Sequence, residues 1–60
     1  MNEDEETIVR RAYAEASLAA KEKGLTGLQA TNAVLAAAAK VSTRILHKAV
    51  TPQDVQRVMR

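Results

Sequence analysis

Residues 21–30, KEKGLTGLQA, decide the fold, because they end one helix and begin another within a few positions. The segment before them, from about residue 4 to residue 23, contains no Gly or Pro and is rich in Ala and Glu, which are strong helix formers. Gly24 tolerates the left-handed backbone conformation that commonly closes a helix, and the cations Lys21 and Lys23 suit the carbonyl end of the helix dipole. We therefore expect a first helix over residues 4–23.

A second helix is expected to begin directly after this glycine. Thr26 and Gln29 have the spacing of a capping box, in which each side chain satisfies a backbone N–H of the first helical turn. Leu25 and Ala30 stand at the positions of the hydrophobic contact that often accompanies such a box. The pattern predicts a helix over residues 27–48.

The last helix boundary follows Val50. Thr51 is a suitable N-cap, Pro52 suits the first helical position, and the carboxylate of Asp54 is favoured by the positive end of the helix dipole. Val50 and Val55 have the spacing of a hydrophobic staple across this boundary. A short third helix is expected to run from here to the end of the chain.

The apolar inventory is poor for a chain of 60 residues. Twelve of its hydrophobic residues are Ala, only Tyr13 is aromatic, and there is no Cys for a disulfide. Chains of this length bury little surface and often need a further source of stability, such as a disulfide, a metal site or oligomerisation. Oligomerisation is the one that remains for this chain. We therefore expect one all-α domain, with helices over about residues 4–23, 27–48 and 52–60, that is stable as an interlocked homodimer.

The apolar residues of the second helix predict where two copies meet. They spread over roughly 160° of the helix, whereas a stripe of about 100° is enough to pack on one surface. We expect this helix to contact both its own chain and a second one. The central helix of a monomeric three-helix bundle also needs a broad apolar arc, so that alternative stays open. The expected interface residues are Leu28, Val34, Leu35, Val41, Ile45 and Leu46.

The first helix has an apolar face of mostly small residues and one large residue outside it. Ile8 and Tyr13 share an arc with several alanines, and such a face allows another helix to approach closely. Leu18 lies off this arc and implies a second contact. Arg11 and Glu15 are spaced for an i,i+4 ion pair on a mixed, solvated side of the helix.

Charge is distributed unevenly along the chain. The formal net charge is +2, but residues 3–6 hold four of the seven acids. The chain from Thr7 onward therefore contains nine Lys and Arg and only three acids, which gives this part a net charge of +6. Such a surplus suits a polyanionic partner. The early acids are expected to favour the helix N-terminus, with residues 1–6 frayed. The alternative is a mobile acidic arm that competes with nucleic acid for the basic residues.

The second helix carries a basic stripe. Lys40, Arg44 and Lys48 recur every four residues, and no acid occurs between Gln29 and Gln53. Like charges at this spacing repel, so an unbroken row is mildly unfavourable unless it meets an anion. A solvated face with cations near the helix C-terminus, where the dipole favours them, is the alternative. Flanking phosphate contacts are expected from Arg10, Lys21 and Lys23.

No catalytic or metal-binding pattern is present. A lone His47 without Cys cannot build a zinc site, and residues 24–27 are too short for a phosphate-binding glycine motif. With a single Tyr and no Phe or Trp, stacking on single strands is disfavoured. We expect a non-enzymatic homodimer without cofactor that binds double-stranded DNA mainly through phosphates. A helical protein–protein interaction module, such as an antitoxin or adaptor, is the alternative.

The chain shows no membrane signal. No apolar run approaches the ~20 residues needed to span a bilayer, and no stretch resembles a signal peptide. Because Cys is also absent, we expect a cytoplasmic protein that does not interact with membranes.

Residues 48–55, KAVTPQDV, resemble the loop and the start of the last helix in histone-fold proteins, which carry a similar Lys-x-Val/Ile-Thr/Lys-x-x-Asp-Val/Ile pattern. The layout of a long central helix between two others is also similar. The resemblance implies a handshake dimer in which the loop of one chain lies beside the first loop of the other, both facing DNA. This arrangement would bring Lys21 and Lys23 near His47 and Lys48. In general style the chain is also similar to small bacterial or plasmid-borne helical DNA-binding proteins.

Overall fold

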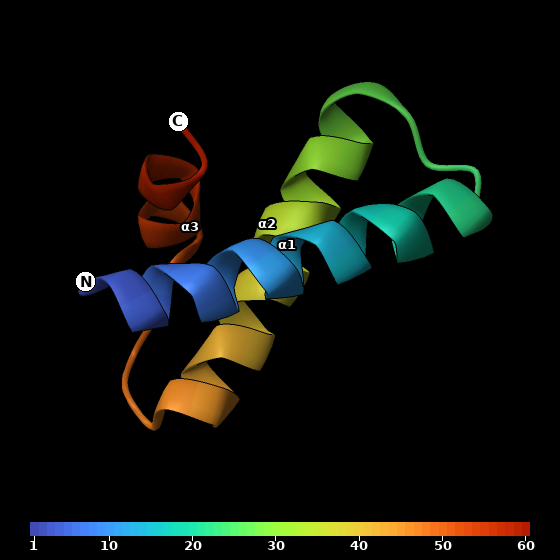
Figure 1. Cartoon of the computed structure of the whole chain (residues 1–60). Coiled ribbons are helices and arrows are strands. Elements are labelled where there is room, and N and C mark those ends of the chain that lie inside the picture. Colours follow the sequence, from blue (N-terminus) through green and yellow to red (C-terminus); the bar gives the residue numbers. More distant parts are fainter.

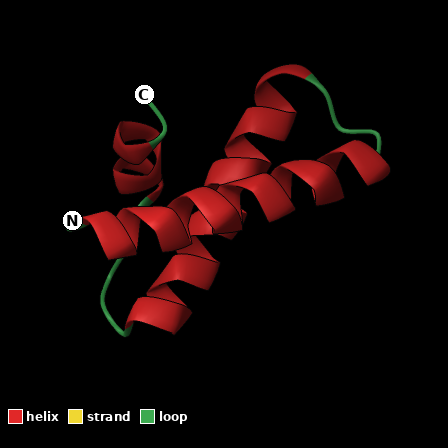
Figure 2. Ribbon diagram, in the orientation of Figure 1, coloured by secondary structure: helices red, strands yellow, loops and turns green.

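The computed structural model describes all 60 residues and contains three helices and no strand. They are α1 (Glu3–Glu22), α2 (Gly27–Leu46) and α3 (Pro52–Val58). Helix α1 crosses α2, and α3 lies beside α2 near the start of α1, so each helix contacts the other two (Figures 1 and 2). The expected all-α fold with three helices is confirmed, although α2 and α3 end two residues earlier than predicted.

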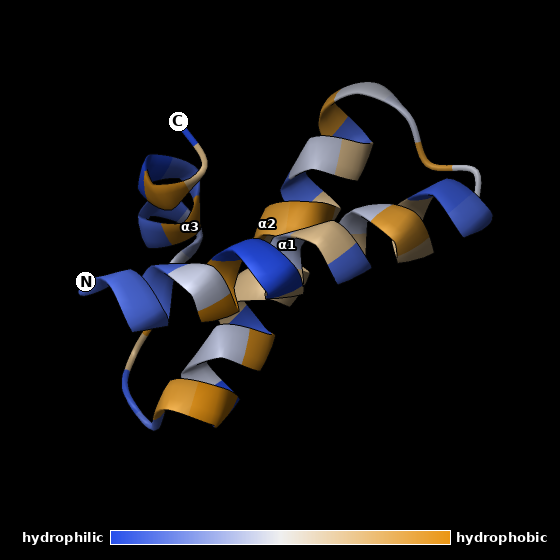
Figure 3. Ribbon diagram, in the orientation of Figure 1, coloured by the Kyte–Doolittle hydropathy of each residue, from blue (hydrophilic) through white to orange (hydrophobic).

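Helix α1 begins with a complete capping box that pattern reading did not identify. The Glu5 N–H donates to Asn2 Oδ1 (2.9 Å), and the Asn2 N–H donates to Glu5 Oε1 (3.1 Å). The four acids of residues 3–6 therefore form the first helical turn, in place of the frayed start that composition suggested. Carboxylates at this position are favoured by the helix dipole. In Figure 3 this first turn is uniformly hydrophilic.

The turn between α1 and α2 is a Schellman motif. Gly24 adopts a left-handed φ of 76°, as predicted. The Leu25 N–H donates to the Ala20 carbonyl (3.0 Å) and the Gly24 N–H to the Lys21 carbonyl (3.0 Å). These two bonds satisfy carbonyls that the end of α1 leaves unpaired.

The start of α2 differs from the prediction. Thr26 has the extended backbone of an N-cap, but its side chain makes no capping hydrogen bond, so the expected box with Gln29 is wrong. Gly27 follows with a left-handed φ of 64°, which turns the chain off the helical path directly after Thr26.

The connection from α2 to α3 is held by side-chain hydrogen bonds. His47 ends α2 in the left-handed region, with φ 55° and ψ 36°, a conformation that histidine tolerates better than most residues. The Val50 N–H donates to Thr43 Oγ1 (2.9 Å), and this hydroxyl donates to the Val50 carbonyl (3.2 Å). Helix α3 then starts at the predicted N-cap Thr51, and the structure adds a full capping box, because the Asp54 N–H donates to Thr51 Oγ1 (3.1 Å) and the Thr51 N–H to Asp54 Oδ2 (3.0 Å).

The core is small and lies where the three helices meet. Its buried residues are all Val or Ala, and half-buried residues such as Tyr13 and Leu35 pack around them. The predicted staple is present, since Val50 and Val55 are both buried. Ser42, which no pattern identified, is fully buried, and its hydroxyl has no hydrogen-bond partner. The core cluster consists of Val9, Ala12, Ala38, Ala39, Val50 and Val55.

Candidate nucleic-acid interface

Lys40 and Arg44 lie at the centre of the exposed face of α2. Neither side chain forms an ion pair. The helical period sets them opposite the buried residues Val34, Ala38 and Ser42, which pack toward the rest of the chain. No acid lies on α2, so nothing on this helix neutralises the two cations. The exposed residues that share or border this face are Gln29, Asn32, Ala33, Ala36 and Ala37.

Lys48 does not continue this row. Because α2 ends at Leu46 and His47 turns left-handed, Lys48 lies off the helix. Its ammonium Nζ lies 2.6 Å from Glu5 Oε2 in the first turn of α1. The expected stripe of three cations on one helix is therefore a stripe of two.

The first turn of α1 pairs with a second candidate cation. Arg10 Nη2 lies 3.3 Å from Glu6 Oε1, one helical turn away. The hydrogen bond from Lys48 and the backbone N–H of Asn2 hold the pKa of Glu5 below its usual range. Two of the six predicted DNA-contacting residues are thus engaged by acids of the same chain.

Lys21 and Lys23 lie at the opposite end of α1. Both are exposed and neither forms an ion pair. A 20-residue helix is about 30 Å long, and Lys48 contacts its other end. Within one chain these lysines are therefore far from Lys48, and the loop pairing implied by the histone-fold resemblance would need a second chain.

The six residues predicted for the dimer interface fall into three groups. Val34 is buried in the chain's own interior. Leu35, Val41 and Leu46 are half-buried against the chain's own core. The remaining two, Leu28 and Ile45, stay 81% and 52% exposed.

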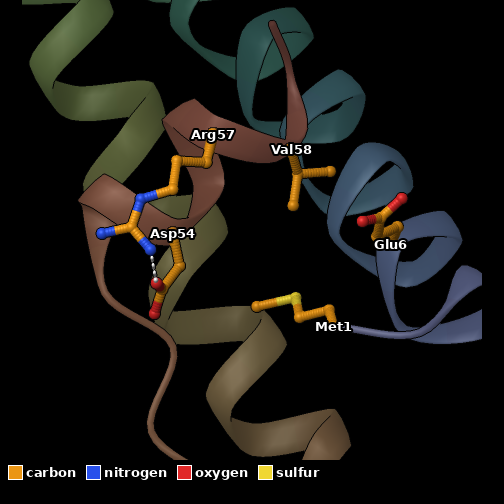
Figure 4. Close-up of a pocket in the computed structure, with 5 residues that line it drawn as sticks. All are labelled: Met1, Glu6, Asp54, Arg57 and Val58. Atoms are coloured by element: carbon orange, nitrogen blue, oxygen red, sulfur yellow. Dashed lines mark ion pairs between the residues drawn. The ribbon is translucent and has the colours of Figure 1, made fainter.

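A shallow hollow between the N-terminus and α3 is lined by two carboxylates, those of Glu6 and Asp54. In Figure 4, Met1 lies between Asp54 and Glu6, with Val58 above. Asp54 pairs with Arg57 (Oδ1 to Nη1, 3.5 Å), and the capping bonds from Thr51 lower its pKa. Because Glu6 is paired with Arg10, no charged side chain in this hollow is free. No cluster of three or more His, Cys, Asp or Glu residues that could hold a metal ion occurs anywhere in the chain.

Comparison with protein-family models, with curated proteins and with solved structures gives no match to this chain. None of its helices is both long enough and apolar enough to cross a bilayer. Function must therefore be argued from the charge and geometry of the chain itself.

Proposed function

We propose that this protein is a homodimer that binds double-stranded DNA mainly through contacts of Lys40 and Arg44 with backbone phosphates. The observation that carries the proposal is the exposed face of α2, where both cations lack an acidic partner. Ala33, Ala36 and Ala37 border them with side chains too short to hold a phosphate backbone away from the helix. Phosphate contacts of this kind supply affinity and position without reading sequence.

The other candidate cations contribute in two ways. Lys21 and Lys23 are unpaired and can take a phosphate without losing a protein partner. Lys48 and Arg10 have to exchange the carboxylates of Glu5 and Glu6 for phosphate. Their net contribution to affinity is therefore smaller. A dimer doubles each of these contacts.

Salt dependence tests the proposal. The protein is titrated with random-sequence duplex DNA at several salt concentrations, and the logarithm of the affinity is plotted against the logarithm of salt concentration. Each phosphate neutralised contributes a slope of about −0.9. Absence of binding at low salt, around 50 mM, would falsify the proposal.

A charge-matched pair of variants locates the contacts. K40A/R44A removes two positive charges from the exposed face of α2, and R57A/R60A removes two from α3 and the C-terminus. We expect the first variant to reduce the steepness of the slope by about 0.9 for each phosphate that is no longer neutralised, and the second to leave the slope unchanged. Equal reductions in both variants would show that binding depends on total charge alone, against the proposal.

A further inference from the structure

One face of α1 carries two apolar and two charged residues that lie outside the core cluster. At about 100° per residue, Ile8, Arg11, Glu15 and Leu18 fall within an arc of about 80°. Leu18 is 61% exposed, although it is one of the few large apolar side chains of the protein. Ile8 is half-buried. We call these four residues the α1 seam.

The two charges of the α1 seam are not paired with each other. Arg11 and Glu15 have i,i+4 spacing, yet they form no ion pair, whereas Glu6 and Arg10 pair at the same spacing. The order explains the difference, because an acid placed before a base suits the helix dipole better than the reverse. Arg11 and Glu15 are thus both available to a partner.

The α1 seam borders an apolar groove between α1 and α2. Arg11 and Glu15 lie along its rim, and its apolar lining consists of Ile8, Ala12, Val41 and Ile45. Ile45 is 52% exposed here. The groove can therefore accept an apolar side chain from outside, with charges of both signs beside it.

The order of residues along the α1 seam is self-complementary. Leu18 follows Glu15 at the same spacing at which Arg11 follows Ile8, so the pattern is symmetric about the midpoint between the two charges. If a second α1 lies antiparallel across that midpoint, Arg11 faces Glu15 of the second copy and Ile8 faces Leu18 of the second copy. The same contacts repeat on the other side of the axis, as a two-fold interface requires. A parallel arrangement would instead oppose like charges.

The spacing within the α1 seam also suits helix pairing. Steps of three, four and three residues are those of the contact positions in a two-helix coiled coil. One turn further out in this antiparallel arrangement, Asp4 lies opposite Glu22 of the second copy, and the two negative charges repel each other. Both are exposed at the helix ends, where solvent and salt screen the repulsion.

The exposed area of the chain leaves room for such a contact. The chain exposes 4349 Å², whereas a compact monomer of its mass exposes about 3,800 Å². A stable interface covers roughly 800 Å² on each partner. A second helix laid along α1 would cover Leu18, the most exposed large apolar side chain of α1, and the groove beside it.

We propose that a second copy of this chain docks on α1, antiparallel to it, so that Leu18 of each copy enters the groove of the other and Arg11 pairs with Glu15 across the axis. The inference rests on the homodimer of the proposed function and moves its contact from the apolar arc of α2 to α1. Of the interface residues predicted from the sequence, it includes Val41 and Ile45 and leaves out Leu28, Val34, Leu35 and Leu46.

A matched pair of substitutions tests the location. L18D places a charge in the α1 seam, and L28D places the same charge on an even more exposed leucine, 81% against 61%, outside it. In sedimentation equilibrium we expect the wild type and L28D at twice the chain mass of 6.5 kDa. L18D should have the single mass with its helical circular dichroism retained. A monomeric wild type, a dimeric L18D or a monomeric L28D overturns the inference.

A charge exchange tests the register and does not depend on the stability of L18D. R11E and E15R each place like charges at both ends of the central contact, so each variant alone should dimerise more weakly than the wild type. Mixed in equal amounts, they place opposite charges at both positions, and we expect association roughly tenfold tighter than in either variant alone. K21E, a reversal on α1 outside the seam, is the control and should leave the wild-type mass unchanged. No gain on mixing refutes the antiparallel register.

The mass measurements are made without DNA and therefore separate the two proposals. A dimer with these responses that fails to bind duplex DNA refutes the DNA-binding role and supports the inference about α1. A wild type that binds DNA as a monomer refutes the inference and leaves the phosphate contacts of Lys40 and Arg44 standing.

Discussion

The two ends of the α1–α2 pair are held together in different ways. At the end where α1 starts and α2 finishes, which we call the capped end, two capping boxes fix the starts of α1 and α3, and the Thr43–Val50 hydrogen bonds hold the loop before α3. The Glu5–Lys48 ion pair at this end joins segments far apart in sequence. At the other end, which we call the turn end and which covers residues 20–31, the contacts are mostly local backbone hydrogen bonds around Gly24. Stability should therefore be concentrated at the capped end.

The largest expected effect comes from truncating a core valine at the capped end. V55A removes two methyl groups from a fully buried side chain that holds α3 against the other helices. We expect the free energy of unfolding to fall by about 2 kcal/mol, from reduced apolar burial and the cavity left behind. The matched change at the turn end, L28A, should alter it by less than about 0.5 kcal/mol. Urea denaturation followed by circular dichroism, at one protein concentration, measures both, and similar decreases would contradict the comparison.

A smaller effect is expected from the hydroxyl that fastens the loop before α3. T43V keeps the shape of the side chain but removes both hydrogen bonds to Val50, whose backbone is buried. We expect a decrease of about 1.5 kcal/mol in the free energy of unfolding. T31V, which removes an exposed hydroxyl bonded within its own helix to Gly27, is the control at the turn end. A larger decrease in T31V than in T43V would show that loop attachment contributes little.

The helix caps should differ by about 1 kcal/mol. T51A removes the hydroxyl that accepts the Asp54 N–H, and loss of such a cap typically costs about 1 kcal/mol. T26A removes a hydroxyl that caps nothing, so the same measurement should detect almost no change. Equal decreases in T51A and T26A would mean that Thr26 caps α2 in solution.

The smallest effect concerns pH and again distinguishes the two ends. Glu5 and Asp54 both lie at the capped end. Hydrogen bonds, from Lys48 first and then from the Asn2 backbone, lower the pKa of Glu5 from its ordinary value of 4.5, and hydrogen bonds from Thr51 lower the pKa of Asp54 from 3.8. A carboxyl whose pKa is lower in the folded chain adds stability above its unfolded pKa, and this contribution is lost as pH falls through the folded pKa. We expect E5Q to reduce the fall in thermal midpoint on acidification below pH 4.5, and D54N to reduce it below pH 3.8. E22Q, at the turn end, has no ion pair to lose and should follow the wild type.

Local signals predicted much of the fold. Gly24 at the end of the first helix and Thr51 as the N-cap of the last were predicted correctly because their chemistry is complete within four or five neighbouring residues. The spacing of a capping box predicted one at Thr26 that does not form, since its geometry depends on whether Gly27 turns left-handed, which a glycine allows either way. The box at Asn2 has the same spacing and was hidden among the acids that follow it.

The candidate site was less predictable because it depends on contacts between distant residues. The basic stripe assumed that the helical period continued to Lys48, and the left-handed His47 ends it earlier. The ion pair of Lys48 with Glu5 joins residues more than forty positions apart, which no local pattern reveals. The sequence showed that Leu18 lies off the apolar face of α1. That Ile8 shares an exposed face with Leu18 becomes clear only once the core-facing side of α1 is known.

Ser42 is a position at which a substitution can raise the stability of the protein. Its hydroxyl is enclosed by the core and has no partner, although the same space would hold a methyl group. Natural proteins rarely reach their stability optimum, and removing an unsatisfied buried hydroxyl recovers about 1 kcal/mol or more. S42A should therefore serve as a stabilised host for charge variants of α1, in which the association of two chains can be weakened while each chain stays folded.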